Sequence, residues 1–562
     1  MSLIVKQTQK ELRTRIIDAL GRAVANGELP GEIIPDFNIE KPANSANGDF
    51  SANVALAGAK AFKKAPSVIA ECIKNNLYLD GTLFDRVEIA GPGFLNFYLS
   101  DRYYSEIVKD VMNKGEDYGK SDFGKGKKIL VEFVSANPTG PMHIGNARGG
   151  AIGDCLSSVL EWAGYEVNRE FYVNDAGNQI EKFATSLEVR YLQLYKDGVE
   201  MPEDAYHGAD ITEHAKNFAE EYGDKYVEAS SEDRRKALVD FALPKNIAGL
   251  ERDLLSYRIK YDRWFKESTL HADGSVKEII EKFKELGVTY EQDGALWFKA
   301  SEFGNDKDVV LIRANGIPTY IVPDIAYHYN KLVTRGYDKA VDVLGADHHG
   351  YVPRMKAALS ALGIDADRLD CVIMQMVRLV RNGETIKLSK RSGKAITLTT
   401  LLEEIPIDAA RFFFNLREPN SHFDFDLDLA AQETSQNPVY YVQYAHARIC
   451  SILKKAQDEG ATLRTPTSEE LDMLTSDEER ELIRHLSTLT DEIVAAAKAY
   501  DPAKITHFVI ELATLFHKFY NARRVMVEDE GLMQARLYLC LAVKETIKNI
   551  LTMLKISAPE TM

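Results

Sequence analysis

The segment from residue 127 to residue 195 constrains the fold of this chain most. Its first ten residues, KKILVEFVSA, form an apolar run typical of a buried strand, and a Pro- and Gly-rich loop follows at 137–150. The next runs, AIGDCLSSVLEWAG, GYEVNREFYVND and AGNQIEKFATSLEVRYLQLY, predict a helix, a strand and a helix. This alternation is typical of a doubly wound α/β domain with a parallel sheet. Later runs of the strand type are expected to extend that sheet: 307–314, 340–347 and 370–377.

The flanking regions have different patterns. At ~100–200 residues per domain, a chain of 562 residues suggests three to four domains. Residues 1–110 combine helical runs with two short strands around Gly91–Pro92–Gly93, which predicts a compact α+β unit. Residues 429–562 hold four long helical patterns and no strand pattern, which predicts an all-helical bundle. The Rossmann-like domain then spans 111–375, and 376–428 connects it to the bundle.

The net charge of 69 − 85 = −16 argues against nucleic-acid binding through the whole surface. Residues 196–233 carry twelve acidic residues and three lysines, and they are expected to form an insertion in the Rossmann-like domain. Residues 375–394 carry six Lys or Arg against one Glu, a basic loop suited to a polyphosphate ligand. A solvated face is the alternative explanation for either charge run.

The five cysteines lie far apart and include no Cys-x-x-Cys pair. We therefore expect reduced thiols in a cytoplasmic protein and no structural zinc site. No apolar run reaches the roughly 18 residues needed to span a bilayer, and the amino terminus has no apolar stretch typical of a signal peptide. Neither membrane insertion nor secretion is expected.

The loop after the first strand, SANPTGPMHIGNARGG, is the first candidate site. Ligands bind at the carboxyl ends of strands in open α/β sheets, and a helix amino terminus favours a phosphate. His143 can donate a hydrogen bond to a phosphoryl oxygen that gains charge in a transition state. We expect the glycines at 145, 149, 150 and 153 to let a base or phosphate approach the backbone. The alternative is a histidine that caps the helix beside a Gly-rich packing face.

The second candidate site is the basic loop Lys387-Leu-Ser-Lys390-Arg391. Two lysines three residues apart can close over a triphosphate and neutralise the leaving pyrophosphate. Such a sequence is also common on protein surfaces. It indicates a phosphate site only in combination with the first candidate loop, about 240 residues upstream.

Together, His143-Ile-Gly-Asn146 and Lys387-Leu-Ser-Lys390-Arg391 resemble the two signatures of class I aminoacyl-tRNA synthetases, His-x-Gly-His and Lys-Met-Ser-Lys-Ser. The wider resemblance is to the arginyl-tRNA synthetase family and covers nearly the whole chain. It is carried by VEFVSANPTGPMHIGNARGGAIGD, GIPTYIVPDIAYH, NSANGDFSANVAL, GPGFLNFYL, NPVYYVQYAHARICSIL and LFHKFYNARRV. The resemblance implies a monomer that joins L-arginine to its tRNA through an arginyl-adenylate, using ATP and Mg²⁺.

The resemblance also implies roles for particular residues. Catalytic roles fall to His143, Lys387 and Lys390, and ATP contacts to these three with Gly145, Asn146 and Ser389. Glu132 and Asp324 would hold the guanidinium, with Tyr320 on the same wall and Asn137 at the backbone end of arginine. Without the resemblance, Glu132 reads as a strand-end surface charge, and Tyr320 and Asp324 as an i, i+4 pair. No metal held by protein side chains is expected, because the cluster at 347–349 lacks partners at ligand spacing.

Several positions depart from the family pattern. Asn146 replaces the second His of the first signature, and Leu388 and Arg391 replace Met and Ser in the second. Asn keeps a donor, so contact with adenine or ribose can persist. Ala346 stands where some relatives have a Gln for the substrate amino group, which Asp347 or His349 would have to replace.

The resemblance assigns tRNA binding to the flanking domains. The bundle sums to a net charge near −4, so its tRNA contact must be local. The aromatic and basic residues Tyr444, Arg448, Tyr520 and Arg524 are the candidates, because aromatic rings stack on splayed bases. Helical spacing also suits these tyrosines to a core, and we expect one or two rings to be exposed. The amino-terminal unit would contact the outer corner of the tRNA.

Three other functions are compatible with parts of the sequence. Another class I synthetase, notably the cysteine enzyme, would need a Cys-rich zinc site that the spacing does not provide. A small-molecule nucleotidyltransferase has no use for two flanking domains. A non-catalytic tRNA-binding paralogue would not need His143, Lys387 and Lys390.

Overall fold

The structure is a computed structural model, and it describes residues 3–31, 35–42, 44, 47–386 and 396–562. A five-stranded parallel sheet lies at its centre, in the order β12-β11-β5-β6-β7. The strands are β5 (Lys128–Glu132), β6 (Glu166–Val173), β7 (Arg263–Lys266), β11 (Lys339–Gly345) and β12 (Leu369–Met374). The chain runs outward from β5 through β6 to β7, then returns to the other side of β5 for β11 and β12. The predicted doubly wound sheet is confirmed, and its order reverses between β5 and β11, where such folds bind ligands.

The prediction that residues 307–314 join this sheet is wrong. β10 (Val309–Ile312) pairs antiparallel with β9 (Ala295–Phe298), which pairs antiparallel with β8 (Thr289–Gln292). Parallel pairing needs a crossover of about a dozen residues or more, whereas a shorter link joins β9 to β10. The fifth parallel strand is β7, whose four residues carry too little pattern to be recognised in the sequence.

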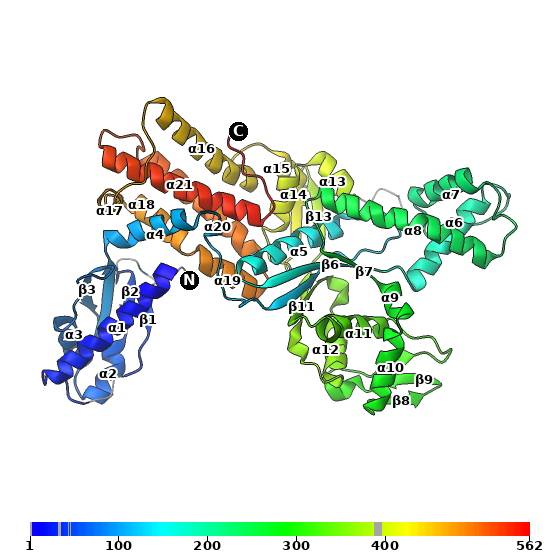
Figure 1. Cartoon of the computed structure of the whole chain (residues 1–562), viewed down its shortest axis with the longest axis horizontal. Helices are drawn as coiled ribbons and strands as arrows, with labels where there is room; N and C mark the ends of the chain where they lie inside the picture. The colour runs from blue at the N-terminus through cyan, green and yellow to red at the C-terminus, as the bar shows by residue number, and fades with distance from the viewer. Residues whose placement is uncertain (1–2, 32–34, 43, 45–46, 387–395) are drawn as a thin grey trace.

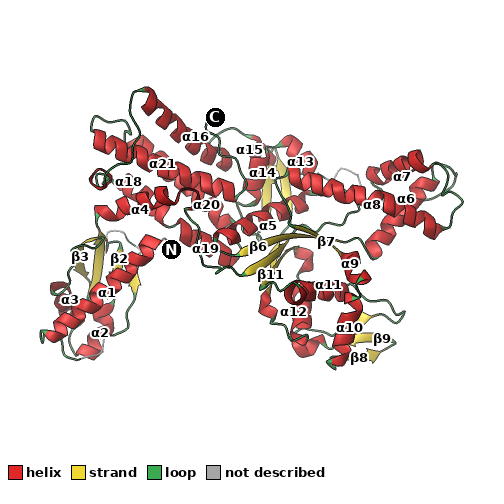
Figure 2. Ribbon diagram, in the orientation of Figure 1, coloured by secondary structure: helices red, strands yellow, loops and turns green. Residues whose placement is uncertain are grey.

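Helices cover both faces of the parallel sheet (Figure 2). Successive strand residues point to opposite faces. On β6, Phe171 and Val173 pack in the core on the side of α5 (Ile144–Trp162), while Tyr172 packs in the core on the side of α11 (Ile321–Tyr329). That second core also includes α9 (Glu267–Ala272), α10 (Ser275–Glu285) and α12 (Tyr351–Ala361).

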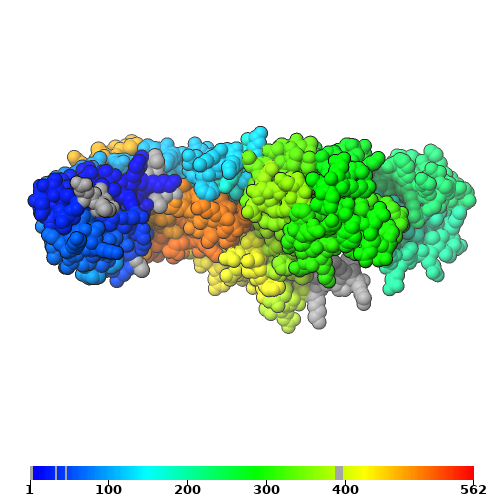
Figure 3. Space-filling model, turned by 90° about the horizontal axis from the view of Figure 1, so that it is seen from below, coloured from blue at the N-terminus to red at the C-terminus, as the bar shows by residue number. Residues whose placement is uncertain are grey.

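The insertion forms one end of an elongated molecule (Figures 1 and 3). It consists of α6 (Asn178–Leu192), α7 (Ala209–Tyr222) and α8 (Ser231–Ser256), and the acidic run at 196–233 contains α7 and the loops on either side of it. These helices share a small core of their own, with Phe183, Tyr191 and Phe218 at its centre.

The amino-terminal unit lies at the other end (Figure 1). Its antiparallel sheet has the order β1-β2-β4-β3 and carries the expected turn at Gly91–Gly93. The elements are α1 (Leu3–Ala25), β1 (Ile39–Glu40), β2 (Phe50–Ala52), α2 (Val54–Phe62), α3 (Pro66–Asn75), β3 (Phe84–Ala90) and β4 (Phe94–Leu99). Their core is separate from the others. The next helix, α4 (Asp101–Lys114), packs against the carboxyl-terminal helices instead, so it belongs with them although its first ten residues were grouped with the unit.

The carboxyl-terminal region is helical, as expected. It contains α16 (Pro438–Asp458), α17 (Ser468–Leu471), α18 (Asp477–Ser487), α19 (Leu489–Ala499), α20 (Ala503–Ala522) and α21 (Glu530–Met553). One of the expected long helices, at 476–500, is two helices in the structure. The helical backbone is interrupted at Thr488, between α18 and α19. None of the described helices is long and apolar enough to cross a membrane.

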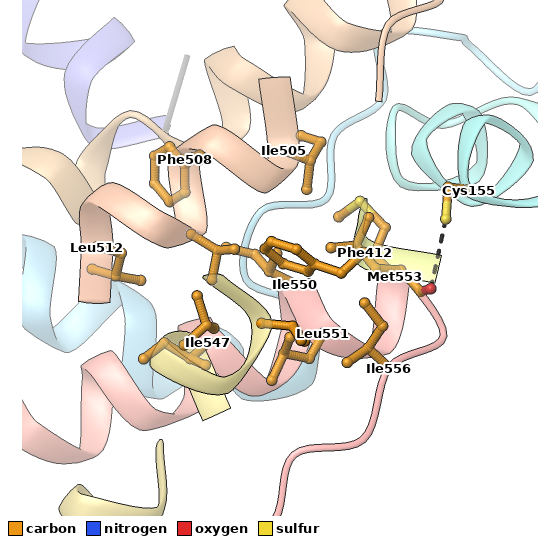
Figure 4. Packing of buried hydrophobic residues seen from close by; sticks show 14 of the residues in the cluster. Cys155, Phe412, Ile505, Phe508, Leu512, Ile547, Ile550, Leu551, Met553 and Ile556 are labelled. Atoms are coloured by element: carbon orange, nitrogen blue, oxygen red, sulfur yellow. Dashed lines mark hydrogen bonds between the residues drawn. The ribbon is translucent and has the colours of Figure 1, made fainter. Parts of the chain in front are cut away.

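The bundle and the Rossmann-like domain share one core (Figure 4). Ile505, Phe508 and Ile550 of the bundle pack together with Phe412 of α14 (Ile407–Phe414). Cys155 of α5 points to the end of α21, where its Sγ lies 3.6 Å from the carbonyl oxygen of Leu554. The connection between the two domains holds α13 (Leu398–Glu404), α15 (Leu427–Ala431), β13 (Val377–Arg381), β14 (Glu384–Thr385) and β15 (Phe423–Asp426).

Candidate active site

Two residues with left-handed backbone follow β5 at the point where the sheet order reverses. Val134 has φ +69° and Ser135 has φ +40°. A β-branched residue rarely adopts this conformation, and strain of this kind is concentrated at functional sites. The turn lets the Ser135 hydroxyl donate to Oε1 of Glu132 (2.9 Å) while it accepts from the backbone N–H of Tyr172 (3.1 Å). Ser135 therefore orients Glu132, a role that no signal in the sequence indicated.

Glu132 is nearly buried and forms an ion pair with a lysine that the sequence analysis missed. Nζ of Lys331 lies 2.5 Å from Oε2 of Glu132 and 2.9 Å from Oδ1 of Asp342. Burial alone would lower the pKa of Lys331, but the two carboxylates raise it above its ordinary value. Burial alone would raise the pKa of Asp342, but Lys331 and His328 hold it well below its usual range. Glu132 is thus part of a buried charged cluster and not a free surface charge.

Asp324 has different surroundings, although it lies in the same region. Asp324 lies in the first turn of α11 and is half-buried. No described group donates a hydrogen bond to its carboxylate or forms an ion pair with it. Burial, together with the nearby charges of Glu267 and Glu132, raises the pKa of Asp324 to about 7 against the opposing effect of His328 and Lys331. Such a carboxylate is stabilised by a ligand that brings a positive charge and hydrogen-bond donors.

Glu267 and Tyr172 add to the same polar region. Burial raises the pKa of Glu267, which is only 8% exposed. Burial also raises the pKa of Tyr172, and the charges of Glu267, Asp324 and Glu132 act on it in the same direction. The charges of Glu132, Asp324 and Glu267 therefore act on one region, and the described lysine that offsets them there is Lys331. The excess negative charge favours a cationic ligand.

The other two residues expected to bind arginine lie apart from this cluster. Tyr320 immediately precedes α11 and its side chain is 57% exposed. Asn137 is exposed, and its Oδ1 accepts a hydrogen bond from Nδ2 of Asn174 (2.9 Å). The structure brings Glu132 and Asp324 into one charged region. Tyr320 meets this region through its backbone, since its carbonyl oxygen accepts a hydrogen bond from the N–H of Asp324 (3.4 Å). Among the described hydrogen bonds, none joins the side chain of Tyr320 or Asn137 to either carboxylate.

His143 is the N-cap residue of α5, as its alternative interpretation proposed. The side chain of Asn146 accepts a hydrogen bond from the backbone N–H of His143 (3.1 Å). The imidazole lies over Gly145, where an added Cβ would come 3.2 Å from Cε1 of His143. The imidazole is exposed, so capping the helix leaves it accessible to a ligand at the helix amino terminus.

Two of the remaining glycines of this loop and helix serve packing. An added Cβ would clash with Ile259 at Gly150 and with Phe133 at Gly153, where the distance is 2.2 Å. At Gly149 it would come 3.0 Å from Cε of Met374, the end of a flexible side chain. All three glycines are buried. Gly150 and Gly153 therefore allow α5 to pack closely against neighbouring side chains, which is a packing role and not the ligand access expected of them, whereas the expectation for Gly149 stays a prediction.

Three residues of the second signature, Lys387, Ser389 and Lys390, lie outside the described residues. The chain on either side of them is described. Before the gap, the N–H of Ile386 donates to the carbonyl oxygen of Leu379 (2.8 Å). After it, Thr397 pairs with His143 as an antiparallel bridge, and the N–H of Leu398 donates to the carbonyl oxygen of Met142 (2.9 Å). The chain that follows the undescribed residues is thus paired with the first signature at Met142 and His143.

A cluster of rings and cations lies between α16 and α20 in the bundle. Arg448 donates from Nη2 to the hydroxyl of Tyr444 (2.7 Å), and its guanidinium lies 4.6 Å from the Tyr444 ring centroid and 5.2 Å from that of Tyr520. Tyr520 is 38% exposed, Tyr440, Tyr441 and Tyr444 are half-buried, and none of these rings is fully buried. Arg524 is exposed just beyond the end of α20. Three of the four predicted tRNA contacts therefore form one surface cluster.

Known protein families account for nearly the whole chain. Residues 10–99 match the arginyl tRNA synthetase N terminal domain, and residues 442–562 match the DALR anticodon binding domain. Residues 107–450, more than half of the chain, match the catalytic domain of tRNA synthetases class I (R). The chain belongs to the arginyl-tRNA synthetase family.

Individual members agree with this over the full length. An arginine–tRNA ligase of Caldanaerobacter subterraneus subsp. tengcongensis is 52% identical over 562 residues, 100% of both chains. The crystal structure of a putative arginyl-tRNA synthetase from Campylobacter jejuni has a TM-score of 0.74 and 35% identity, covering 83% of this chain and 100% of the other. Arginyl-tRNA synthetase of Thermus thermophilus, 22% identical, shares the fold with a TM-score of 0.72 over 98% of this chain and 100% of the other.

Proposed function

We propose that this chain, as a member of the arginyl-tRNA synthetase family, activates L-arginine with ATP and transfers it to the tRNA for arginine. The observation that carries the proposal is the pair of carboxylates at the reversal of the sheet order. Asp324 has no partner among the described donors, and Glu132 is fixed beside the same charged region. That region lies at the carboxyl end of β5, from which the loop to α5 also starts.

Arginine suits this region better than other amino acids. Its guanidinium presents five donors in a planar fork and stays charged at every relevant pH. Asp324 takes one side of the fork and Glu132 contributes charge from the end of β5, while Tyr320 and Asn137 move onto the bound amino acid. Lysine has no fork and leaves carboxylate oxygens unpaired, which a site built for hydrogen bonds rejects strongly.

Activation needs positioning and charge stabilisation but no general base. The carboxylate of arginine is already ionised at neutral pH, so it attacks the α-phosphate directly. His143, Gly145 and Asn146 receive ATP at the amino terminus of α5, with Ser389 as a further ATP contact, and Lys387 and Lys390 neutralise the leaving pyrophosphate. Among the described residues, no group of three or more His, Cys, Asp or Glu side chains is arranged to hold a metal. Mg²⁺ therefore enters on the phosphates of ATP, as it does in many nucleotide enzymes.

The bundle recognises tRNA through the aromatic–cationic cluster of Tyr444, Arg448 and Tyr520, with Arg524 beside it. Stacking on a splayed base contributes about 1–3 kcal/mol per ring. The amino-terminal unit contacts the outer corner of the tRNA. The proposal also includes a monomer and a cytoplasmic location. The five free cysteines are consistent with a reducing compartment.

Charging of total tRNA with each of the twenty amino acids tests this function. We expect ATP-dependent incorporation of arginine alone. Efficient charging with another amino acid, or none with arginine in a folded preparation, would contradict the proposal.

A further inference from the structure

Lys331 occupies an unusual backbone position. It lies in a π-helical turn, Asn330–Thr334, that directly extends α11. Single π-turns inside helices often occur at functional sites, because the extra residue turns a side chain in a direction that the α-helix would not allow. Here the side chain of Lys331 is fully buried. A lysine is rarely buried without a specific role for its charge.

The ammonium of Lys331 has contacts on three sides. It contacts Glu132 (2.5 Å) and Asp342 (2.9 Å), and it lies 4.1 Å from the ring centroid of Tyr327. One cation therefore serves two carboxylates that belong to neighbouring parallel strands, β5 and β11. Without it, these carboxylates would repel one another in a region of low dielectric.

A continuous series of hydrogen bonds connects Lys331 to Asp324. Oδ2 of Asp342 lies 2.7 Å from Nε2 of His328, and Nδ1 of His328 lies 2.8 Å from the backbone carbonyl oxygen of Asp324. On the other side, Glu132 accepts from Ser135. One buried network, with Lys331 and Asp342 at its centre, thus joins the carboxylate of Glu132 to the backbone of Asp324, while the Asp324 carboxylate itself stays outside it.

We propose that Lys331, supported by Asp342, is a positioning residue for arginine recognition. It fixes the carboxylate of Glu132 at the end of β5 and neutralises the charges behind the pocket, so that Asp324 is left as the unpaired anion that selects a guanidinium. This inference rests on the proposed function. It differs from a purely structural role, which would affect folding or the affinities for both substrates and not arginine selectively.

The test uses the full-length chain and direct binding of arginine and of ATP by calorimetry. The double variant Lys331→Met, Asp342→Asn removes one positive and one negative charge, so the network keeps its net charge. We expect arginine to bind at least tenfold more weakly, with ATP affinity changed less than twofold. A folded double variant with unchanged arginine affinity would overturn the inference.

A matched control removes another buried ion pair far from the pocket. Arg536 and Glu479 pair within the bundle (2.7 Å) and are both nearly buried. The variant Arg536→Met, Glu479→Gln has the same change in charge, and we expect its arginine affinity to equal that of the wild type. An equal loss in the control would mean that any buried-pair deletion weakens arginine binding, and it would overturn the inference.

Two further variants cover the cases in which the double variant does not fold or the proposed arginine site is itself wrong. If the Lys331 double variant does not fold, Lys331→Arg keeps the charge but cannot place a compact ammonium between the two carboxylates. We expect at least a fivefold loss of arginine affinity, and an unchanged value would overturn the inference. The variant Glu132→Gln distinguishes failure of this inference from failure of the proposed function. Unchanged arginine binding in that variant would show that Glu132 is not part of the arginine site, which would contradict the proposed function. Weakened binding there, with no effect at Lys331, would refute only the positioning role.

Discussion

At the scale of single residues, the two pocket carboxylates differ in what stabilises them. Glu132 has Lys331 and Ser135 as partners, whereas the carboxylate of Asp324 has none among the described residues. Family resemblance identified both carboxylates from the sequence. Lys331 and Ser135 could not be predicted, because their roles arise from a π-helical turn and from left-handed backbone at 134–135. Neither feature changes the apolar periodicity on which sequence-based prediction depends.

The raised pKa of Asp324 predicts that arginine affinity depends on pH. In the protein without bound arginine, the Asp324 carboxyl has a pKa of about 7, so it is mostly protonated and neutral below that pH. A guanidinium binds the ionised form, and the KM for arginine should therefore rise as pH falls, roughly tenfold between about pH 8 and about pH 6. Steady-state charging across this range, with the KM for ATP measured alongside, checks the effect. Asp324→Asn should show a high KM for arginine with little pH dependence, and a pH-independent wild type would refute the role of Asp324.

At the scale of elements, the length of a helix or strand determined whether the sequence could predict it. The long apolar runs of β5, β6 and β11 and the long helices of the bundle were recognised correctly. The four-residue strands β7 and β10 were missed or misplaced, because so short a run specifies neither a partner nor a direction. The glycines of α5 were predicted to serve a ligand, but Gly153 serves helix packing, since a close approach to Phe133 is visible only in three dimensions.

The basic loop gives a prediction at this scale. Thr397, a few residues after Lys390 in the sequence, pairs with His143 as an antiparallel bridge. Lys390→Ala should lower the rate of adenylate formation or overall charging by at least tenfold, in line with the ~10²–10³ that a single transition-state donor contributes. Thermal unfolding of the variant should match that of the wild type. Normal charging kinetics would show that the loop is only a solvated surface.

At the scale of the whole molecule, the two flanking regions are attached in different ways. The bundle shares a core with α5 and α14, so a chain truncated before it would expose much apolar surface and should not fold. The amino-terminal unit has its own core. Its contacts with the rest of the chain include an ion pair of Arg484 with Asp49 (3.1 Å) and a few partly buried apolar residues, among them Leu83 and Leu99. Sequence patterns predicted two flanking regions. They did not show this difference, because it depends on contacts between residues hundreds of positions apart.

The aromatic–cationic cluster predicts how the bundle contributes to tRNA affinity. Tyr520→Ala removes the most exposed ring and should raise the KM for tRNA about tenfold, since one stack contributes about 1–3 kcal/mol. The KM values for arginine and ATP should not change. Tyr538, a partly buried tyrosine of α21, offers a control in Tyr538→Phe, for which no change in the tRNA KM is expected. A Tyr520→Ala enzyme with wild-type tRNA kinetics would mean that anticodon recognition lies elsewhere.

The central claim is that a charged guanidinium, held by Asp324 and Glu132, defines the substrate. Charging of tRNA with arginine, lysine and citrulline, the neutral isostere of arginine, tests this most directly in the wild type and in Asp324→Asn. The wild type should use arginine at least about 10³-fold more efficiently than either analogue, because each leaves a buried carboxylate unpaired. Asp324→Asn should lose most of its preference for arginine over citrulline. Comparable charging with citrulline by the wild type, or undiminished selectivity in Asp324→Asn, would contradict the account.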